Sequence, residues 1–287
     1  KTAYRFSVNA GNSINDGTVI NENEQNLDWD GDWLSATSIS DTGWYAEIFI
    51  PWAITSMKSQ KGEERTIGFC FYRMMIAEYK VSATCKGSPY VNKFLSVFDV
   101  MNFKKYEVSQ LDFFPYVTLS DDAATEEKDT KVGAEVFWKI DSSKQLNATF
   151  NPDFGQVESD ELVVNFSAAE TYYSDKRPFF AENQSMFEVQ GYQMFYVINT
   201  RRIGGAPDYN CSSFSSKIAS SCSTSQKGTS AIDIAIRYIQ QSENLDFGFL
   251  GASEKDEDFS QGRDFYATKF RKTSKNFSVG YLGTYVE

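Results

Sequence analysis

The acidic stretch at residues 26–33, NLDWDGDW, has the residue types and spacing that metal or sugar binding would use. Asn26, Asp28 and Asp30 place oxygen ligands at alternate positions, and a glycine then allows a sharp turn, as in the first half of a calcium-binding loop. An EF-hand is excluded, because Thr37 stands where its closing bidentate Glu would be. A looser calcium site stays open, with the ligands Asn26, Asp28, Asp30 and Asp32.

Two tryptophans, Trp29 and Trp33, alternate with these acids and give the stretch two other interpretations. Their indole rings could form a platform on which a sugar stacks. They could instead pack in a β-core beside an ordinary Asp-Gly turn, which is the simplest explanation of the local pattern. The residues themselves leave the calcium loop, the sugar platform and the structural turn open.

Composition excludes several classes of function. No histidine occurs among the 287 residues, and the formal net charge is −11. Without histidine, Ser-His-Asp and Cys-His catalysis cannot operate and the commonest zinc ligand is missing. An acidic chain also lacks the basic surface that phosphate groups bind, so no nucleic-acid partner is expected. Catalysis without histidine stays open, but a non-enzymatic protein is preferred. No cofactor is expected to be required, and calcium is the metal candidate.

The four cysteines form two local pairs. Cys211 and Cys222 lie in a Ser-rich segment without other metal-ligating residue types, which indicates a loop-closing disulfide made in an oxidising compartment. Cys70 and Cys85 could form a second disulfide. Alternatively Cys70, in the apolar run IGFCFY, is a buried thiol.

Strand-like segments occur throughout the chain, but their length and pattern change near residue 109. Residues 1–108 predict a compact β-sandwich-like domain with strands at AYRFSVNA, WYAEIFIPW and TIGFCFYRMM and a short helix at Ala53–Met57. From Leu111 onward, segments of about ten residues follow, the length of a tilted membrane-spanning strand. They are LDFFPYVTLS, KVGAEVFWKI, KQLNATFN, MFYVINTRRIG, SAIDIAIRYIQ, LDFGFLGAS, DFYATKFRK and NFSVGYLGTY.

Alternation within these segments is typical of strands with one apolar face. Ile232, Ile234 and Ile236 are predicted to share one face, with Asp233 and Arg237 on the other. Tight turns at KIDSSKQ, IQQSENL and RKTSKNF alternate with longer polar loops at SDDAATEEKDTK, residues 206–230 and SEKDEDFSQGRD. This asymmetry favours an outer-membrane β-barrel, with the short turns periplasmic and the long loops outside. A soluble β-sandwich, which also gives alternating strands, is the alternative.

A family resemblance adds to this pattern. NPDFGQVE-D, VVN-S, E--Y-S-KRPFF-EN and RRIG within residues 151–204 resemble bacterial outer-membrane proteins in which a β-domain similar to carbohydrate-binding module family 9 precedes a β-barrel of unassigned function. W-G-W and W-AEI-IPW, here with Trp33 and Trp44, are similar to the module. The resemblance implies a module at residues 1–108, truncated at its start, and the first part of a barrel at 109–287. It also implies sugar binding at Trp29, Trp33 and Trp44.

The barrels of this family look larger than the strands in this chain can form. Because an unpaired strand edge is not viable in lipid, remaining chain or a protein partner is expected to complete the barrel. Both ends of the sequence look like cuts through structured regions, so we expect it to be a segment of a longer or processed protein. No apolar run approaches the roughly 18 residues of a membrane helix.

Residues 150–190 interrupt the strand pattern and are predicted to fold inward. Their charges could form a salt-bridged plug in a polar barrel lumen. The residues concerned, including two arginines that follow the segment, are Glu158, Asp160, Glu170, Lys176, Arg177, Glu182, Arg201 and Arg202. The same charges could line a substrate path. Glycoside hydrolysis needs a pair of carboxylates, and such a pair could come from Asp153, Glu158, Asp160 and Glu161. No spacing in the sequence indicates which two of them would form the pair.

Together these patterns lead us to expect an outer-membrane barrel with a periplasmic N-terminal domain, acting in transport, export or envelope assembly. Its partners would be membrane lipid and a polysaccharide or glycan. A soluble protein that binds or cleaves polysaccharide and a structural subunit of a surface assembly are the alternatives.

Overall fold

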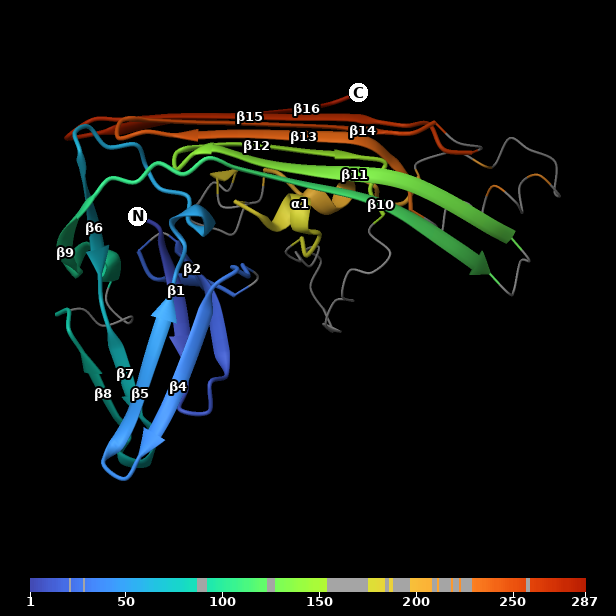
Figure 1. Cartoon of the computed structure of the whole chain (residues 1–287). Coiled ribbons are helices and arrows are strands. Elements are labelled where there is room, and N and C mark those ends of the chain that lie inside the picture. The colour runs from blue at the N-terminus through green and yellow to red at the C-terminus, as the bar shows by residue number, and fades with distance from the viewer. Residues whose placement is uncertain are drawn as a thin grey trace, which may run out of the picture. The chain divides into compact units, whose positions relative to one another are not determined.

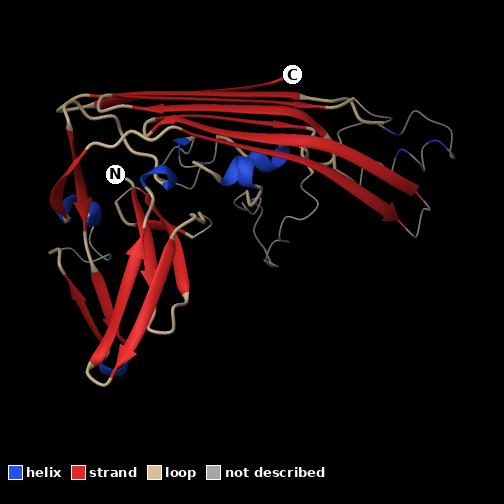
Figure 2. Ribbon diagram, viewed as in Figure 1, coloured by secondary structure: helices blue, strands red, loops and turns tan. Residues whose placement is uncertain are grey.

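The computed structural model of the chain describes residues 1–20, 22–27, 29–86, 92–122, 127–153, 175–183, 186–187, 197–207, 211, 218, 222, 229–256 and 259–287, with the backbone alone at 77, 120–122 and 127–129. The chain divides into two compact units, Lys1–Val108 and Ser109–Glu287. Both units consist mainly of strands, and the described helices are short (Figure 2). The chain is therefore all-β, as predicted. In the described part of the chain, no helix has the length and apolar character needed to cross a membrane.

The first unit contains small antiparallel sheets. One sheet has the strand order β1-β2-β3, and the other strands pair as β4 with β5, β6 with β9 and β7 with β8. The strands are β1 (Ala3–Val8), β2 (Ile14–Ile20), β3 (Glu24–Asn26), β4 (Leu34–Ser40), β5 (Gly43–Phe49), β6 (Glu64–Phe69), β7 (Tyr72–Met75), β8 (Lys80–Ala83) and β9 (Asp99–Lys104). The short helix expected at Ala53–Met57 is the 3-10 turn η1 (Trp52–Ile54), and η2 (Ile76–Glu78) and η3 (Phe94–Val97) are further turns of this kind.

The disulfide predicted between Cys211 and Cys222 and the one left open between Cys70 and Cys85 are both present. Cys70 and Cys85 are bonded with a Cα–Cα distance of 5.2 Å, and Cys211 and Cys222 with 5.8 Å. All four cysteines are described, and none of them is free. The alternative of a buried Cys70 thiol is wrong.

The second unit contains a seven-stranded antiparallel sheet in which the strands follow the order of the sequence (Figure 1). They are β10 (Gln110–Asp122), β11 (Glu127–Asp141), β12 (Lys144–Phe150), β13 (Ile232–Gln241), β14 (Leu245–Glu254), β15 (Asp264–Thr273) and β16 (Ser278–Val286). Phe150 pairs with Ile234, so β12 and β13 are neighbours although about eighty residues separate them in the sequence. Residues 151–231 are therefore an insertion into a simple meander.

The two faces of this sheet differ in chemistry. On β14, Asp246, Leu250 and Glu254 are buried on the face against which the short helix α1 (Pro178–Ala181) packs, whereas Phe247 and Phe249 point the other way. We call these the covered face and the open face. Strand register extends the open face to Leu111, Phe113, Pro115, Val117, Leu119, Val132, Ala134, Val136, Trp138, Leu146, Ala148, Phe150, Ile234, Ile236, Tyr238, Leu245, Phe247, Phe249, Gly251, Tyr266, Thr268, Phe270, Val279, Tyr281, Gly283 and Tyr285.

A β-bulge corrects the expected facing of β13. The register shifts between Ile232 and Ile234, so Ile232 joins the covered core at 3% exposure while Ile234 and Ile236 lie on the open face. The prediction that all three isoleucines share a face is wrong. An extra residue in one strand cannot be recognised from alternation, because apolar residues stand on both sides of it.

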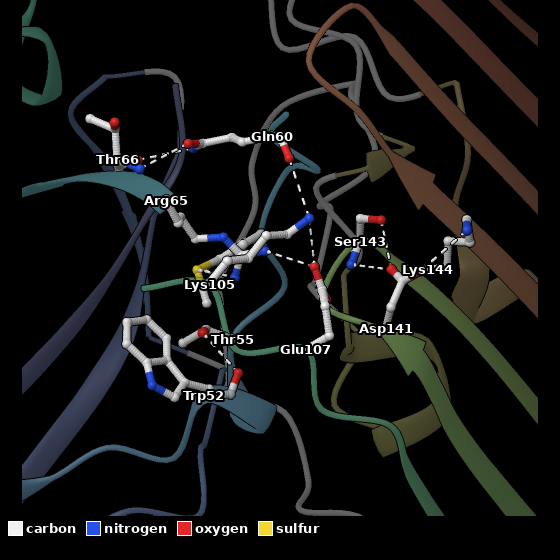
Figure 3. A network of polar contacts seen from close by, with 11 residues as sticks. Trp52, Thr55, Gln60, Arg65, Thr66, Lys105, Glu107, Asp141, Ser143 and Lys144 are labelled. Atoms are coloured by element: carbon white, nitrogen blue, oxygen red, sulfur yellow. Dashed lines mark hydrogen bonds and ion pairs between the residues drawn. The ribbon is translucent and has the colours of Figure 1, made fainter. Parts of the chain in front are cut away.

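Other predicted boundaries also change. The three tight turns occur as expected, and in the first of them Asp141 accepts hydrogen bonds from the backbone and hydroxyl of Ser143, both at 2.7 Å (Figure 3). The predicted long loop SDDAATEEKDTK is instead largely strand, because β10 extends to Asp122 and β11 begins at Glu127. The strand predicted at MFYVINTRRIG is wrong for its described residues, where Thr200–Arg202 form the 3-10 turn η5.

Candidate functional site

A carboxylate from the insertion is held by polar side chains on the covered face. Glu182 follows α1, and its Oε1 accepts from Gln145 Nε2 at 2.6 Å. Its Oε2 accepts from Asn147 Nδ2 at 2.6 Å and from Arg237 Nη2 at 3.0 Å. Gln145 also accepts from Asn183 Nδ2 at 3.1 Å. Strands β12 and β13 therefore present donors that converge on one carboxylate, and we call Gln145, Asn147 and Arg237 the donor cluster.

Arg237 is the central charge of this arrangement. It is only 3% exposed and lies between Ala235 and Ile239, which both belong to the apolar core of the covered face. Its guanidinium donates to the backbone oxygen of Phe179 and lies 5.3 Å from the centre of the Phe179 ring. A buried guanidinium needs such a set of acceptors, because an unpaired charge costs several kcal/mol to bury (about 3–5 when one partner is removed). Arg237 thus ties α1 to the middle of the sheet.

Arg177 links the start of α1 to the RRIG segment. Its Nη1 donates to Ile203 O at 2.7 Å and its Nη2 to Thr200 O at 2.8 Å. Asp175, 2% exposed, pairs with the same guanidinium at 2.6 Å and accepts from the Thr200 hydroxyl at 2.8 Å. The guanidinium also lies 4.2 Å from the centre of the Phe180 ring. Two arms of the insertion that are distant in sequence are therefore one packed unit.

Glu254 connects the RRIG segment to the far end of β14. This buried carboxylate accepts from Gly204 N at 2.8 Å and from Arg263 Nε at 2.9 Å. Gly204 has φ +71°, a left-handed conformation that glycine adopts at little cost. The backbone amide of Gly204 consequently reaches the strand, and the insertion is held at both ends of the covered face.

The insertion begins at a fixed turn. After β12, Asn151 adopts φ +46° and donates its backbone N–H to Asp233 O at 2.7 Å, at the bulge of β13. Its side chain donates to Val132 O at 2.8 Å, and its backbone oxygen accepts from the Tyr116 hydroxyl at 3.1 Å. The FNPDFG turn that marks the start of the unusual segment is thus bonded to strands β10, β11 and β13.

The residues that make these contacts lie within a region, residues 108–271, that matches the family described as Domain of unknown function (DUF5916). The chain belongs to this family. The matched region contains the donor cluster, α1, Arg177 and Glu254, and it excludes the first unit apart from Val108. No curated protein and no solved structure matches the chain.

Several residues of the predicted charged plug can be placed within the DUF5916 region. Arg177 and Glu182 make the covered-face contacts described above, and Arg201 and Arg202 belong to η5. Lys176 is half-buried beside α1. Outside the described residues lie Glu158, Asp160, Glu161 and Glu170, so the proposed carboxylate pairs for glycoside hydrolysis have no described geometry.

Sequence reasoning missed most partners of these charges. Gln145, Asn147, Asp175 and Glu254 were not selected, although β12 carries a usable signal. Its polar residues Gln145, Asn147 and Thr149 alternate with Leu146, Ala148 and Phe150, and a polar row on a buried strand face needs hydrogen-bond partners. What the pattern could not supply was the identity of the partner, Glu182, 35 residues from Asn147.

In the first unit, the NLDWDGDW loop is organised around Asp16. The Asp16 carboxylate accepts from Gly31 N at 3.0 Å and from Trp33 Nε1 at 2.8 Å. Trp33 is 4% exposed and packs edge-on against Phe6, so it is a core residue. Trp29 is partly buried against Tyr4 and Phe6. The structural-turn interpretation fits Trp33, and sugar binding remains a prediction for Trp29 and for Trp44, which lies 5.9 Å from the Arg73 guanidinium.

The calcium prediction stays a prediction. Asn26 is half-buried in β3, whereas Asp30 and Asp32 are exposed and Asp28 lies outside the described residues. Within the residues that the structure describes, no group of three or more acidic or cysteine side chains is arranged to hold a metal.

A second polar network of the first unit surrounds Arg65, which is 2% exposed. Glu107 pairs with Lys105 at 2.8 Å and with Arg65 at 3.7 Å (Figure 3). Lys105 also donates to the backbone oxygen of Gln60 at 3.3 Å, and the Gln60 side chain bonds the backbone of Thr66. These contacts join the loop before β6 to the end of β9, which is a structural role.

Proposed function

We propose that this chain is part of an outer-membrane β-barrel protein, whose N-terminal domain is periplasmic and related to carbohydrate-binding module family 9. The open face of the seven-stranded sheet would face lipid and the covered face would line the lumen. In this proposal the protein acts in transport, export or envelope assembly.

The observation that carries the proposal is the composition of the open face. The residues listed above are uncharged, and nearly all are aliphatic or aromatic. The same register places the charged residues Lys144, Asp264 and Lys272 on this face only at the strand ends. Many of them are strongly exposed, including Leu119 at 77%, Tyr281 at 64% and Phe113 at 60%. Soluble monomers rarely expose an apolar surface spread over so many strands, whereas a lipid-facing barrel surface requires one.

The limits of this apolar surface also agree with a membrane band. From Leu111 to Leu119 it extends for about 27 Å along β10 at the usual rise per residue, close to the height of the apolar band of outer-membrane barrels. Polar residues follow at the strand ends, with Lys144 beside Leu146 and Gln240 beside Tyr238. Tyr266 and Tyr285 stack near one border with ring centres 6.4 Å apart, as aromatic girdles do.

The covered face supports a polar lumen. Arg237, Glu254 and Asp246 lie there, and the insertion packs over them with Arg177 and Glu182. Charges of this kind are acceptable inside a barrel wall and not against lipid. We therefore propose that residues 175–183 and 197–204 are part of a plug.

The two edge strands of the sheet indicate how a barrel wall would be completed. In the described part of the sheet, β10 and β16 each pair on one side only, and an unpaired edge in lipid leaves backbone groups without hydrogen bonds. We propose that further strands of the same protein or of a partner close the barrel. Two disulfides agree with passage through an oxidising periplasm.

Membrane extraction tests the proposal. When the full chain is expressed with export to the envelope, it should sediment with outer membranes and require detergent for release. It should also stay in the membrane during washes with sodium carbonate or roughly 4–6 M urea, which remove peripheral proteins. Recovery in the soluble fraction without detergent would contradict the proposal. That result would favour a soluble polysaccharide-binding protein in which a second sheet covers the open face.

A further inference from the structure

The donor cluster has the properties of a ligand site rather than of a simple structural contact. Gln145 and Asn147 stand on β12 and Arg237 on the neighbouring β13, and all three side chains are at most 5% exposed. Their amide and guanidinium N–H groups point to the same carboxylate and bond both of its oxygens. All three donors stand on paired strands of the sheet, and Gln145 Nε2 also donates to Asn147 Oδ1 at 3.0 Å. From the insertion, Asn183 donates to Gln145 and Phe179 O accepts from Arg237.

We infer that the donor cluster is a carboxylate-binding site of the sheet, in which Glu182 acts as an internal ligand, and that a small carboxylate-bearing solute can occupy it in place of Glu182. Two amides and one guanidinium form a common type of carboxylate recognition, because they neutralise the charge and satisfy the oxygen lone pairs. The ammonium of Lys139 on β11 adds electrostatic attraction toward the same carboxylate.

The position of Glu182 supports exchange with a solute. Its side chain is 25% exposed, so part of Glu182 meets solvent while its donors are buried. Glu182 lies just beyond the four-residue α1, in a segment held to the sheet by side-chain contacts and not by strand pairing. Withdrawal of this one side chain would leave the donors of the sheet in place. The inference does not rest on the proposed function, because it is argued from contacts on the covered face alone and holds whether lipid or water meets the open face.

Glu182→Ala makes the site testable with acetate. The substitution removes one methylene and the carboxylate with its carbon, four heavy atoms, which equals the heavy-atom content of acetate. In the Glu182→Ala protein, we expect carbon-13 acetate to bind saturably by NMR with a dissociation constant on the order of 1–10 mM, a modest affinity for so small a ligand. Acetate at 100 mM should raise the thermal midpoint by about 4 °C over sodium chloride of equal ionic strength.

Matched variants separate this site from general anion effects. Glu243→Ala removes an exposed carboxylate from the β13–β14 turn and should bind acetate no better than the unchanged protein, in which Glu182 fills the site. The second variant combines Glu182→Ala with Asn147→Leu, which keeps the shape of the side chain but removes its N–H donor. This double variant should bind acetate at least roughly tenfold more weakly, because the bound carboxylate loses one hydrogen bond. Equal acetate binding by Glu182→Ala and Glu243→Ala would overturn the inference.

Refolding yield provides the measurement if Glu182→Ala does not fold by itself. In that case 100 mM acetate should restore folded protein and equal sodium chloride should not. Failure of acetate to restore folding would then overturn the inference. Both readouts report only on the donor cluster, and they are independent of whether the protein needs detergent.

Discussion

Arg237→Gln is expected to lower the free energy of unfolding by about 3–4 kcal/mol, which is the loss typical of removing one partner of a buried ion pair. The substitution leaves the Glu182 carboxylate without its charged partner and the Phe179 carbonyl without its donor. We place the effect in the lower part of the range because the Glu182 side chain is 25% exposed and water can reach it. Denaturant titration followed by tryptophan fluorescence measures this loss.

A double substitution shows whether the loss comes from the pair. Adding Glu182→Gln to Arg237→Gln removes the stranded charge, and it should recover about 1–2 kcal/mol, the usual coupling of contacting groups. Lys272→Gln removes an exposed positive charge from β15 of the same sheet and should change stability by less than about 0.5 kcal/mol. An Arg237→Gln protein as stable as Lys272→Gln would refute the role given to Arg237.

Ile236→Arg, on the open face, is expected to cost about 2–4 kcal/mol of folding free energy in a bilayer, as arginine does near the midplane of a membrane barrel. Ile236 stands near the centre of β13 and of the apolar band, where it pairs with Ala148 and Gly251. If this face met water, the same substitution at a position with 37% exposure would be close to neutral. The sign and size of the effect therefore report on the solvent of the open face.

Gln240→Arg is the matched control for Ile236→Arg. It places the same side chain on the same strand and face, but at the strand end, where the expected cost falls to about 0–1 kcal/mol. Folding into lipid vesicles at increasing urea, followed by heat-modified migration on gels, compares the two variants. Similar costs at both positions would contradict a depth-dependent environment.

Much of the sheet could be predicted from the sequence because its signals are local. Segments of about ten residues with strand-forming composition identified β13, β14 and β15, and tight turns of Ser, Asn and Lys indicated where neighbouring strands meet. Disulfide pairing was also predictable, since each pair closes a short loop of 11 or 15 residues in a chain with no competing cysteines nearby. These features need no knowledge of distant residues.

The contacts of the insertion could not be predicted because they depend on long-range packing. The pairing of β12 with β13 can be predicted only if residues 151–231 are first recognised as an insertion into the meander. The bulge at Ile232–Ile234 reverses the facing of Ile232 without any change in the apolar pattern. Likewise, nothing beside Glu182 in the sequence indicates that Gln145, Asn147 and Arg237 surround it.

The central claim, that the open face contacts lipid, is tested most directly through Trp138. This residue lies on the open face of β11 at 39% exposure, and the other tryptophans, Trp29, Trp33, Trp44 and Trp52, belong to the first unit. Subtracting the fluorescence of a Trp138→Phe protein from that of the unchanged chain in lipid vesicles isolates its emission. The account predicts that bromine atoms on the lipid acyl chains quench this emission and that aqueous iodide does not. Quenching by iodide without quenching by brominated lipid would contradict it.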